Sequence, residues 1–495
     1  MNPGALIVGR TVLLLGAVIS LFVGCMTVGP DYQPPTPTIP AAWSRGSGPG
    51  VTQVVTNDSV VLSRWWSVFR DPILTELMER ARTGNQDLRQ AEARLRQARA
   101  QRNLAQADRM PTVAVNASAR RSRGSEETGS GRTASLFANG FDASWEADIF
   151  GAQRRQIESA QATLEASQEE VRDVQVSLFA EVALNYVEYR LFQTRWEITE
   201  TNLASQTEIY NLTRWREQAQ LVTQLDVDQA RLSLEQTRAE IPALQTGLEQ
   251  AEHQLATLLG QAPGSLTTLL GGPQDLPIPA TEIAVGVPAD VLRRRPDVRR
   301  AERKLAAQTA QIGVAQAARY PDFTLSGSIG LEALTAGNLY TVGARTAQAV
   351  AQAGWTLFDG GRIRQNIEVQ TALQEEALGV YQAAVLTALQ EVEDALVAYA
   401  NEQVRRRALR EAVLAGQSAF ELARNKYASG IIDFQTVLNT QQSLLNVQDK
   451  QASSDAEVVS NLIRLYKALG GGWNPIAPEV AKTTQQQGLS HELSR

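Results

Sequence analysis

Cysteine is almost absent from this chain of 495 residues, and several patterns that define enzymes are missing as well. The single cysteine, Cys25, has no partner for an intramolecular disulfide. The two histidines, His253 and His491, do not lie in a spacing typical of metal ligands. No G-x-S-x-G sequence and no phosphate-binding P-loop occurs. The sequence therefore predicts a protein that is not an enzyme, with no metal site and no cofactor.

A basic excess and a long hydrophobic run are also lacking. The chain carries 47 Lys and Arg residues against 53 Asp and Glu residues, whereas nucleic-acid-binding proteins usually show a marked basic excess. We therefore expect no nucleic-acid partner, and we expect the run Arg293–Arg295 to be the exposed start of a helix rather than a binding patch. After residue 25 no stretch of eighteen apolar residues occurs, so no transmembrane helix is predicted. If the mature chain enters a membrane, we expect it to do so as a β-barrel.

The first 24 residues have the features of a bacterial signal peptide. Arg10 supplies positive charge, and Thr11–Val23 is apolar. The segment Leu21–Cys25 resembles a lipobox, in which the cysteine becomes the acylated first residue of the mature protein, although Phe22 replaces the usual leucine. We expect Cys25 to be lipidated. The alternative is an ordinary secretory peptide with an incidental buried cysteine.

An internal duplication with a constant offset of 210 residues organises the rest of the chain. The clearest matches are Asp87–Glu92 with Asp297–Glu302, Trp145 with Trp355, Gly151 with Gly361 and Arg214 with Arg424. The predicted domains are a signal peptide at 1–24, a lipid-anchored extended segment at 25–71, a first repeat at 72–260, a connector at 261–281, a second repeat at 282–470 and a polar tail at 471–495.

Each repeat contains segments with the composition and spacing of helices. Ala, Gln, Arg, Leu and Glu dominate the first segment of each repeat, which ends before Pro111 or Pro321. A much longer segment follows, with a heptad-like apolar seam that requires partner helices, and the chain then returns after a short tip. The expected helices are 72–110, 151–218 and 224–260 in the first repeat and 288–320, 362–428 and 434–469 in the second, with tips at 219–223 and 429–433.

Between these helices apolar and polar residues alternate, which is typical of β-strands. The expected strands form one hairpin per repeat and cover about 111–120, 136–149, 321–330 and 346–358. Such alternation suits a barrel with lipid outside and water inside, and Asp142, Glu146 and Asp148 would then face the lumen. A solvated polar face would explain the same acids, and soluble hairpins packed on their own helices are the alternative to a barrel.

One chain supplies too few strands for a closed barrel, since the smallest membrane barrels have about eight. Two, three or four copies of a four-stranded chain would give about 8, 12 or 16 strands. The strand pattern by itself does not choose among these numbers.

Short motifs spread along the chain resemble those of one family. They are Gly29-Pro30-Asp31-Tyr32, Trp65-Trp66-x-x-Phe69-x-Asp71-Pro72-x-Leu74, Arg294-Arg295-Pro296-Asp297-Val298-Arg299-x-Ala301-Glu302 and Leu357-Phe358-Asp359-Gly360-Gly361. The chain resembles the outer-membrane lipoprotein component of resistance-nodulation-division efflux systems, the NodT-type branch of the TolC outer-membrane factor family. The resemblance implies an α+β, TolC-like fold in which three chains build a 12-stranded transmembrane β-barrel, continued by a 12-helix periplasmic α-barrel. It also implies a periplasmic adaptor (membrane fusion) protein and an inner-membrane transporter as partners.

The helical tips carry the candidate site residues. The resemblance places Asp433 and Ile432 at a periplasmic gate, where three copies of Asp433 would form an acidic ring; alternatively, Asp433 caps a helix, as Thr223 would in the first repeat. Apolar residues at these turns would be exposed unless a partner covers them. The expected adaptor contacts are Leu221, Val222, Gly430 and Ile431, flanked by Arg214 and Lys426, although packing between neighbouring tips would explain them too.

The sequence and the resemblance together predict the exit duct of a tripartite efflux pump. This duct would be a passive homotrimeric channel for drugs or other small toxic compounds. We expect it to be lipid-anchored in the outer membrane, in contact with outer-membrane lipid, and to extend into the periplasm. A type I protein-secretion duct is one alternative, and a periplasmic coiled-coil scaffold without a pore is another.

Overall fold

The structure is a computed structural model that describes residues 27–44, 52–54, 62–128, 131–272, 274–277, 282–284 and 288–473. The predicted signal peptide and Cys25 lie outside these residues, as does the tail beyond Trp473. The chain divides into two compact units. The sheet unit comprises 1–36, 93–168 and 300–383, and the helical unit comprises 37–92, 169–299 and 384–495.

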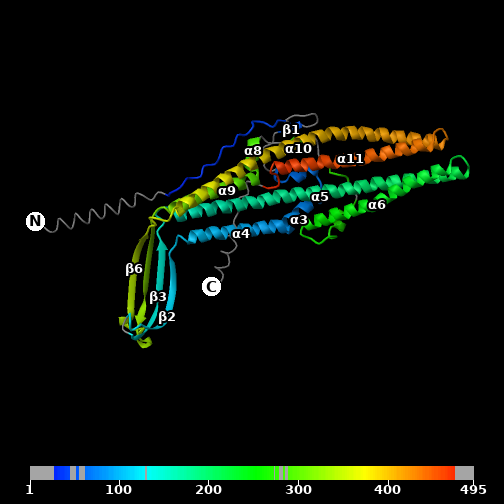
Figure 1. Ribbon diagram of the computed structural model, residues 1–495. Helices are drawn as coiled ribbons and strands as arrows, with labels where there is room; N and C mark the ends of the chain where they lie inside the picture. Colours follow the sequence, from blue (N-terminus) through cyan, green and yellow to red (C-terminus); the bar gives the residue numbers. More distant parts are fainter. Residues whose placement is uncertain are drawn as a thin grey trace, which may run out of the picture. The chain divides into compact units, whose positions relative to one another are not determined.

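The sheet unit contains one antiparallel sheet of four strands, drawn in cyan to yellow in Figure 1. Each repeat supplies one hairpin, and the pairing of β3 with β5 joins the two hairpins. β2 and β6 form the edges, and neither has a second partner among the described residues. The strands are β2 (Thr112–Arg123), β3 (Thr133–Glu146), β5 (Asp322–Ala333) and β6 (Arg345–Gly354), in the order β2-β3-β5-β6.

The strand ends differ by up to four residues from those expected from the alternation. β2 continues to Arg123 because this residue still pairs with Thr133 on β3. β3 ends at Glu146, because the chain then turns and Ile149 N–H bonds the Ala147 carbonyl at 2.8 Å. The hydrogen bonds between neighbouring strands therefore determine where each strand ends. Alternation within one strand does not reveal these bonds.

Apolar and polar residues lie on opposite faces of this sheet. Val115, Phe141 and Ile329 are cross-strand neighbours on one face, and Asp142 and Ser328 are neighbours on the other. The apolar face is exposed in the single chain: Val115 is 71% exposed and Ile329 is 64% exposed. An apolar face of this size requires lipid or another chain to cover it.

Two tryptophans connect the sheet to the segments that lead into it. Trp145 Nε1 donates to the Arg109 carbonyl at 2.9 Å, and Trp355 Nε1 donates to the Arg319 carbonyl at 3.1 Å. The two bonds are related by the repeat. Both indole rings remain partly exposed, as expected for a side chain with an apolar body and one polar atom at an interface.

The first described residues are held tightly on the sheet unit. The buried Arg155 donates to the carbonyl oxygens of Val28 at 3.1 Å and Gly29 at 3.0 Å, and it pairs with Asp31 at 2.7 Å. Gly29 has no room for a side chain, since a Cβ there would lie 2.3 Å from the Cα of Gly313.

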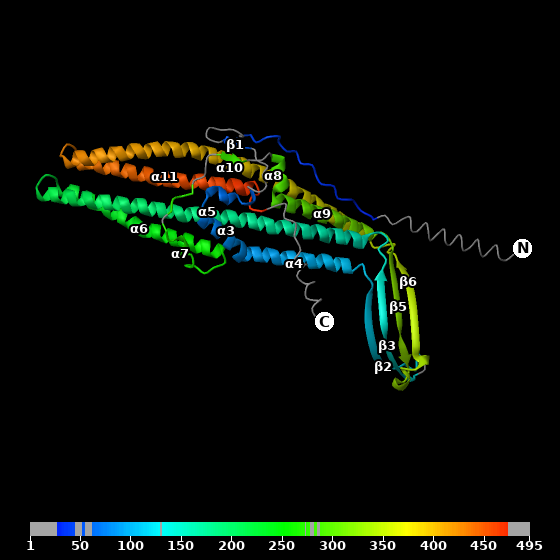
Figure 2. The same cartoon turned by 180° about the vertical axis from the view of Figure 1, so that it is seen from behind.

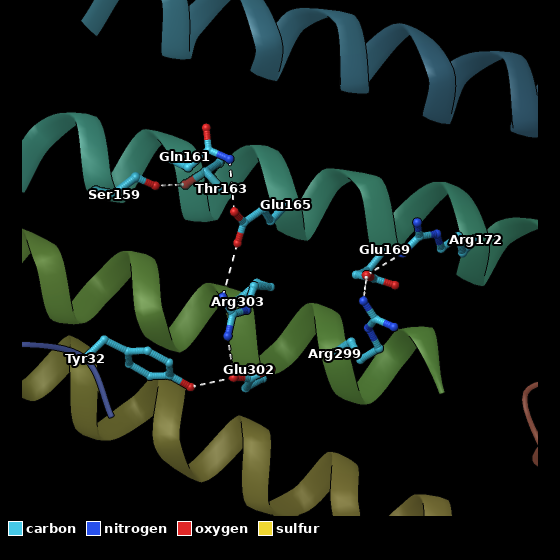
Figure 3. A network of polar contacts seen from close by, with 10 residues as sticks. All are labelled: Tyr32, Ser159, Gln161, Thr163, Glu165, Glu169, Arg172, Arg299, Glu302 and Arg303. Atoms are coloured by element: carbon cyan, nitrogen blue, oxygen red, sulfur yellow. Dashed lines mark hydrogen bonds and ion pairs between the residues drawn. The ribbon is translucent and has the colours of Figure 1, made fainter. Parts of the chain in front are cut away.

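A chain of polar contacts continues this attachment (Figure 3). The Tyr32 hydroxyl donates to Glu302 at 2.9 Å, and Arg303 bridges Glu302 and Glu165. The Gly29-Pro30-Asp31-Tyr32 motif therefore has a structural role, which is to fix the N-terminal segment to the helices of the sheet unit.

The helical unit is built on two long helical hairpins, whose first residues belong to the sheet unit. Figures 1 and 2 show the hairpins side by side, with their loops at the same end. The loops comprise residues 219–223 and 429–433. α5 (Ala152–Gln218) returns as α6 (Gln224–Leu258), and α10 (Arg362–Ala428) returns as α11 (Phe434–Ala468).

The segments 72–110 and 288–320, each expected as one helix, are both broken in two. α3 (Pro72–Gly84) and α4 (Gln86–Ala107) meet at Asn85, and α8 (Pro288–Arg294) and α9 (Pro296–Ala317) meet at Arg295. Asn85 Nδ2 donates to the Leu258 carbonyl at 2.8 Å, and Arg295 Nη1 donates to the Ala468 carbonyl at 2.9 Å. Each break thus satisfies a terminal carbonyl of a returning helix. Gly84 and Pro296 are local signals for these breaks. The acceptors could not be predicted locally, because each lies 173 residues away.

The expectation that Arg293–Arg295 is exposed is wrong for Arg295. Its side chain is 8% exposed and pairs with Asp297 at 2.6 Å and Glu391 at 2.7 Å. Arg293 alone fits the expectation, with a side chain that is 81% exposed. Further along the same motif, Arg299 pairs with Glu169 at 2.8 Å (Figure 3).

The motif with two tryptophans fills the core of the helical unit. Trp65, in the 3₁₀-helix η1 (Trp65–Phe69), is 1% exposed and stacks on Tyr466 with ring centroids 5.6 Å apart. Asp71 caps α3 and also accepts the buried Tyr186 hydroxyl at 2.6 Å. Burial is the main cause of the raised pKa of Tyr186, and the hydrogen bond to Asp71 is the second cause. The hydroxyl therefore stays protonated and donates.

Short elements complete the described residues. Within these residues, no helix combines the length and the apolar character needed to cross a membrane. The short elements are the parallel pair β1 (Thr52–Val54) and β4 (Glu282–Ala284), the helix α7 (Thr267–Leu270), and the 3₁₀-helices η2 (Ala336–Asn338) and η3 (Val342–Ala344).

Candidate functional site at the helical tips

Both helical hairpins turn through loops with the same backbone geometry. Gln220 (φ 60°) and Gly430 (φ 74°) occupy the left-handed region at positions related by the repeat. The N–H groups of the next residues, Leu221 and Ile431, bond carbonyl groups of the preceding helix at 2.8 and 2.9 Å. Glycine is the usual residue at such helix ends, so Gln220 carries a conformational cost that Gly430 does not.

The caps of the returning helices use the same two residue types in opposite order. At the start of α6, Asp226 accepts from both the N–H and the Oγ1 of Thr223 at 2.8 Å. At the start of α11, Asp433 accepts from the N–H and the Oγ1 of Thr436 at 2.9 and 2.6 Å. The carboxylate therefore stands at the cap position in one tip and about one helical turn later in the other.

The structure supports the alternative that Asp433 is a helix cap. The side-chain and backbone hydrogen bonds from Thr436 hold the pKa of Asp433 below its ordinary value. The residue is also exposed. Its carboxylate is therefore charged at neutral pH, and the gate role, which needs three copies, stays a prediction.

A small apolar cluster stabilises the tips from within the chain. Tyr427 and Phe434 pack with ring centroids 5.8 Å apart, and Ile432 packs against the same cluster. The guanidinium of Arg216, from the other hairpin, lies 4.6 Å from the ring centroid of Tyr427 and donates to its carbonyl oxygen. The Tyr427 hydroxyl bonds Thr213 at 3.2 Å. Each tip is thus fixed to its neighbour in the same chain.

The predicted adaptor contacts differ in their exposure. Leu221 and Ile431 are 69% and 70% exposed, although both are large apolar residues. Gly430, Arg214 and Lys426 are exposed as well, whereas Val222 is half-buried. The exposed part of the candidate surface therefore consists of two apolar side chains with a cation on the preceding helix of each tip.

Sequence reasoning missed Arg216 and Tyr427. Tyr427 has no aromatic counterpart in the first repeat, where Glu217 stands. This difference was no signal, because most tip positions differ between the two repeats, as Trp215 differs from Asn425.

Two of the three acids expected to line a lumen lie on the sheet. Asp142 and Glu146 are on its polar face, and Asp142 accepts a hydrogen bond from Asn116. The expectation that Asp148 lies on a strand is wrong, because Asp148 follows β3 and caps α5, accepting from Gln153 N–H at 3.2 Å and Arg154 N–H at 3.0 Å. The N–H groups at the start of a helix lack partners within the helix and attract a carboxylate, and this attraction determines the position of the Asp148 side chain.

Asp359 has the same role in the second repeat. It accepts from Ile363 N–H at 2.6 Å and Gly361 N–H at 2.8 Å, and these bonds lower its pKa. The Leu357-Phe358-Asp359-Gly360-Gly361 motif therefore precedes and caps α10, with Gly360 and Gly361 in left-handed conformations.

The described part of the chain contains no group of three or more His, Cys, Asp or Glu side chains arranged to hold a metal ion. The lipidation candidate, Cys25, lies outside the described residues.

Comparison with known proteins decides the family. The model of the family described as outer membrane efflux protein matches residues 77–261 and 287–471, one match in each repeat. The chain belongs to this family. Nodulation protein T of Rhizobium leguminosarum bv. trifolii is 33% identical over 473 residues, which cover 92% of this chain and 96% of the relative. The antibiotic efflux pump outer membrane protein ArpC of Pseudomonas putida is 32% identical over 472 residues, covering 93% and 96%.

Solved structures show the same fold. The outer-membrane channel OprN matches with a TM-score of 0.85 and 37% identity, over 90% of this chain and all of that one. The open state of the Neisseria gonorrhoeae MtrE outer membrane channel matches with a TM-score of 0.80 and 28% identity, over 90% and 99%. The predicted TolC-like fold with two repeats, the role in efflux and the place in the outer membrane are confirmed.

Replacing Asp433 tests its predicted gate role separately from the cap. Asn accepts the same hydrogen bonds without the charge, so we expect Asp433→Asn to change the melting temperature by less than about 1 °C. We expect its single-channel conductance in planar bilayers to rise about twofold, because an acidic ring would be neutralised. Since the pKa of Asp433 is lowered, we expect the parent conductance to hold down to about pH 5 and to rise only below about pH 4.

The matching control is Asp226→Asn, which neutralises the acid of the other tip. Asp433→Ala, which loses both charge and cap, should melt lower than Asp433→Asn. Equal conductance in parent and Asp433→Asn would leave capping as the only role of Asp433.

Proposed function

We propose that three copies of this efflux protein close into a channel that serves as the passive exit duct of a tripartite efflux pump. The observation that carries the proposal is the four-stranded sheet, with an apolar face, a polar face and two unpaired edges. Backbone groups in lipid find no water, so a sheet edge there must be paired. Pairing β2 of one copy with β6 of the next closes the sheet, and three copies give about 12 strands.

The long helical hairpins continue the duct in this proposal. Each copy contributes α5, α6, α10 and α11, and their apolar seams need partner helices in neighbouring copies. Exposed apolar residues on these helices support such neighbours, among them Leu386 at 66% and Leu414 at 58%. The acids Asp142 and Glu146 then line the barrel lumen and favour cations.

The tips are the proposed docking surface for a periplasmic adaptor protein. Leu221 and Ile431 present apolar area to the helical hairpin of the adaptor, and Arg214 and Lys426 flank it. Ile432 supports the gate from inside the tip cluster. An inner-membrane resistance-nodulation-division transporter supplies the energy, and this chain performs no catalysis.

Drugs or other small toxic compounds are the proposed cargo. Relatives at 32 to 33% identity are named for antibiotic efflux, toluene efflux and pyoverdine export. Because similarly related channels are named for such different compounds, the choice of cargo rests mainly with the inner-membrane partner.

Acylation of Cys25 is the proposed anchor. Val28 is held by Arg155 only three residues after Cys25, and each residue spans at most about 3.5 Å. Cys25, the attachment point of the acyl chain, would therefore lie within about 11 Å of the held segment of the sheet unit. The proposed domain limits are those expected from the repeat, with the anchor segment at 25–71 and the connector at 261–281.

Two measurements on the purified full-length protein test the proposal. Native mass spectrometry should give three chains per particle, and planar bilayers should show discrete conductance steps. A monomer or a particle without conductance would favour the periplasmic scaffold. Export of a protein rather than a drug, measured in cells, would favour the secretion duct.

A further inference from the structure

Three arginines lie on the apolar face of the sheet, near the end that carries the hairpin loops 124–132 and 334–344. Side chains alternate along a strand, so Arg121 and Arg123 share the face of Val113 and Val115 on β2. Arg345 on β6 pairs with Leu331, which belongs to the same face. All three arginines are exposed. We call Arg121, Arg123 and Arg345 the arginine cluster.

The strand geometry places Arg121 at the border of the apolar band. Arg121 pairs with Ser135, and ten residues of β3 separate Ser135 from Trp145. At about 3.4 Å per residue this is about 34 Å along the strand. A membrane strand tilted by about 35 to 45° covers about 24 to 28 Å of depth over that length, and the apolar band of such barrels is about 25 Å tall. With Trp145 at one border, Arg121 lies at the other, among the lipid headgroups.

No carboxylate shares this face within the four strands. The acids of the strands are Asp142, Glu146, Asp322 and Glu332, and all four lie at alternate positions that belong to the polar face. Outside the strands, Glu126 lies 3.5 Å from Arg123, but both side chains are at least 70% exposed. The attraction between two such exposed side chains is weak, so the arginine cluster keeps its net positive charge.

Closure of the barrel would bring the arginines together, a step that rests on the proposed function. β2 and β6 are the two edges, and each carries its arginines at the loop end. Pairing these edges places Arg121 and Arg123 of one copy near Arg345 of the next, on the lipid side of the seam. Three cations without an acid repel one another unless an anion lies among them.

We propose that the arginine cluster binds the phosphate groups of a phosphorylated lipid headgroup in the surface leaflet of the outer membrane. The guanidinium group is always charged and matches phosphate oxygens with two parallel hydrogen bonds. Basic side chains at a membrane surface each strengthen binding to anionic lipid by about fivefold. The apolar face below the cluster would hold the acyl chains of the same lipid.

Native mass spectrometry of the full-length protein in detergent, titrated with bis-phosphorylated lipid A, tests this proposal. We expect Arg121→Gln, Arg123→Gln and Arg345→Gln each to weaken binding about fivefold, and the triple variant to weaken it on the order of 100-fold. The matched control is Arg120→Gln, which removes an arginine from the polar face of the same strand and should bind within about twofold of the parent. Dephosphorylated lipid A should bind the parent as weakly as lipid A binds the triple variant. Inorganic phosphate at millimolar concentration should not displace the lipid.

The same spectra separate this proposal from the proposed function. Absence of a three-chain particle in the parent would overturn the proposed duct, and with it the proposed pairing of β2 with β6 between copies. An intact, conducting particle that binds both lipids equally, or whose Arg120→Gln variant loses as much affinity as Arg121→Gln, would overturn the arginine cluster alone. If the triple variant does not assemble, the lipid A affinities of the three single variants test the proposal.

Discussion

We expect Leu221→Asp combined with Ile431→Asp to abolish the drug resistance that the proposed duct would confer. Both side chains are about 70% exposed at the tips, and the proposed adaptor would bury them. Burying two such residues is worth about 3 kcal/mol or more, so their replacement by charged groups should weaken adaptor binding at least about 100-fold. The minimum inhibitory concentration should fall to that of a strain without the protein.

The control for this pair is Ser429→Asp, which adds a charge to the same loop without removing apolar area. Ser429 is exposed, and its hydroxyl bonds only a carbonyl of its own helix. Native mass and amount in the outer membrane should match the parent in all variants. Full resistance in the double variant, with normal assembly, would show that the adaptor does not use these residues.

The second large effect is on stability, and it concerns Arg295. We expect Arg295→Met to lower the free energy of unfolding by about 2 to 3 kcal/mol, because it leaves the partly buried carboxylate of Asp297 and the carbonyl of Ala468 without their charged donor. Arg295 binds Asp297, Glu391 and the Ala468 carbonyl. Thermal denaturation of the detergent-solubilised protein measures the loss.

Arg293→Met is the matched control, since Arg293 belongs to the same run but is 81% exposed. It should change the stability by less than about 0.5 kcal/mol. Equal stability of the two variants would contradict the buried role of Arg295.

Acid should weaken the same contact. Burial by itself would raise the pKa of Asp297, but the hydrogen bond and charge of Arg295 hold it below its ordinary value. A carboxyl group with a lowered pKa in the folded state stabilises the protein above its unfolded pKa of about 3.9 and loses this contribution as the pH falls further. The difference between parent and Arg295→Met should therefore shrink below about pH 4.

The repeat made much of the tip predictable. Both loops were expected at 219–223 and 429–433, and the helices end and begin on either side of these residues. Leu221 and Ile431 were expected to be exposed, and they are. These features follow from local rules on helix ends, turns and caps, which act within a few residues.

The contacts made at the breaks Asn85 and Arg295 could not be predicted in the same way. Gly84 and Pro296 beside them are local signals for a helix break. Each break also serves a carbonyl group at the end of another helix, and no local signal reveals that partner. Asp148 was misplaced for a related reason, because helix capping took precedence over strand alternation.

The sequence by itself determined the elements of this efflux protein and their order. Alternation, heptad spacing and the 210-residue offset are periodic signals, and periodic signals report local structure. Only the tertiary structure decided which residues meet across the chain, such as Arg216 with Tyr427 at the tips and Arg155 with the segment after Cys25. The physical reason is that such contacts depend on where distant elements lie, and no spacing along the sequence encodes that distance.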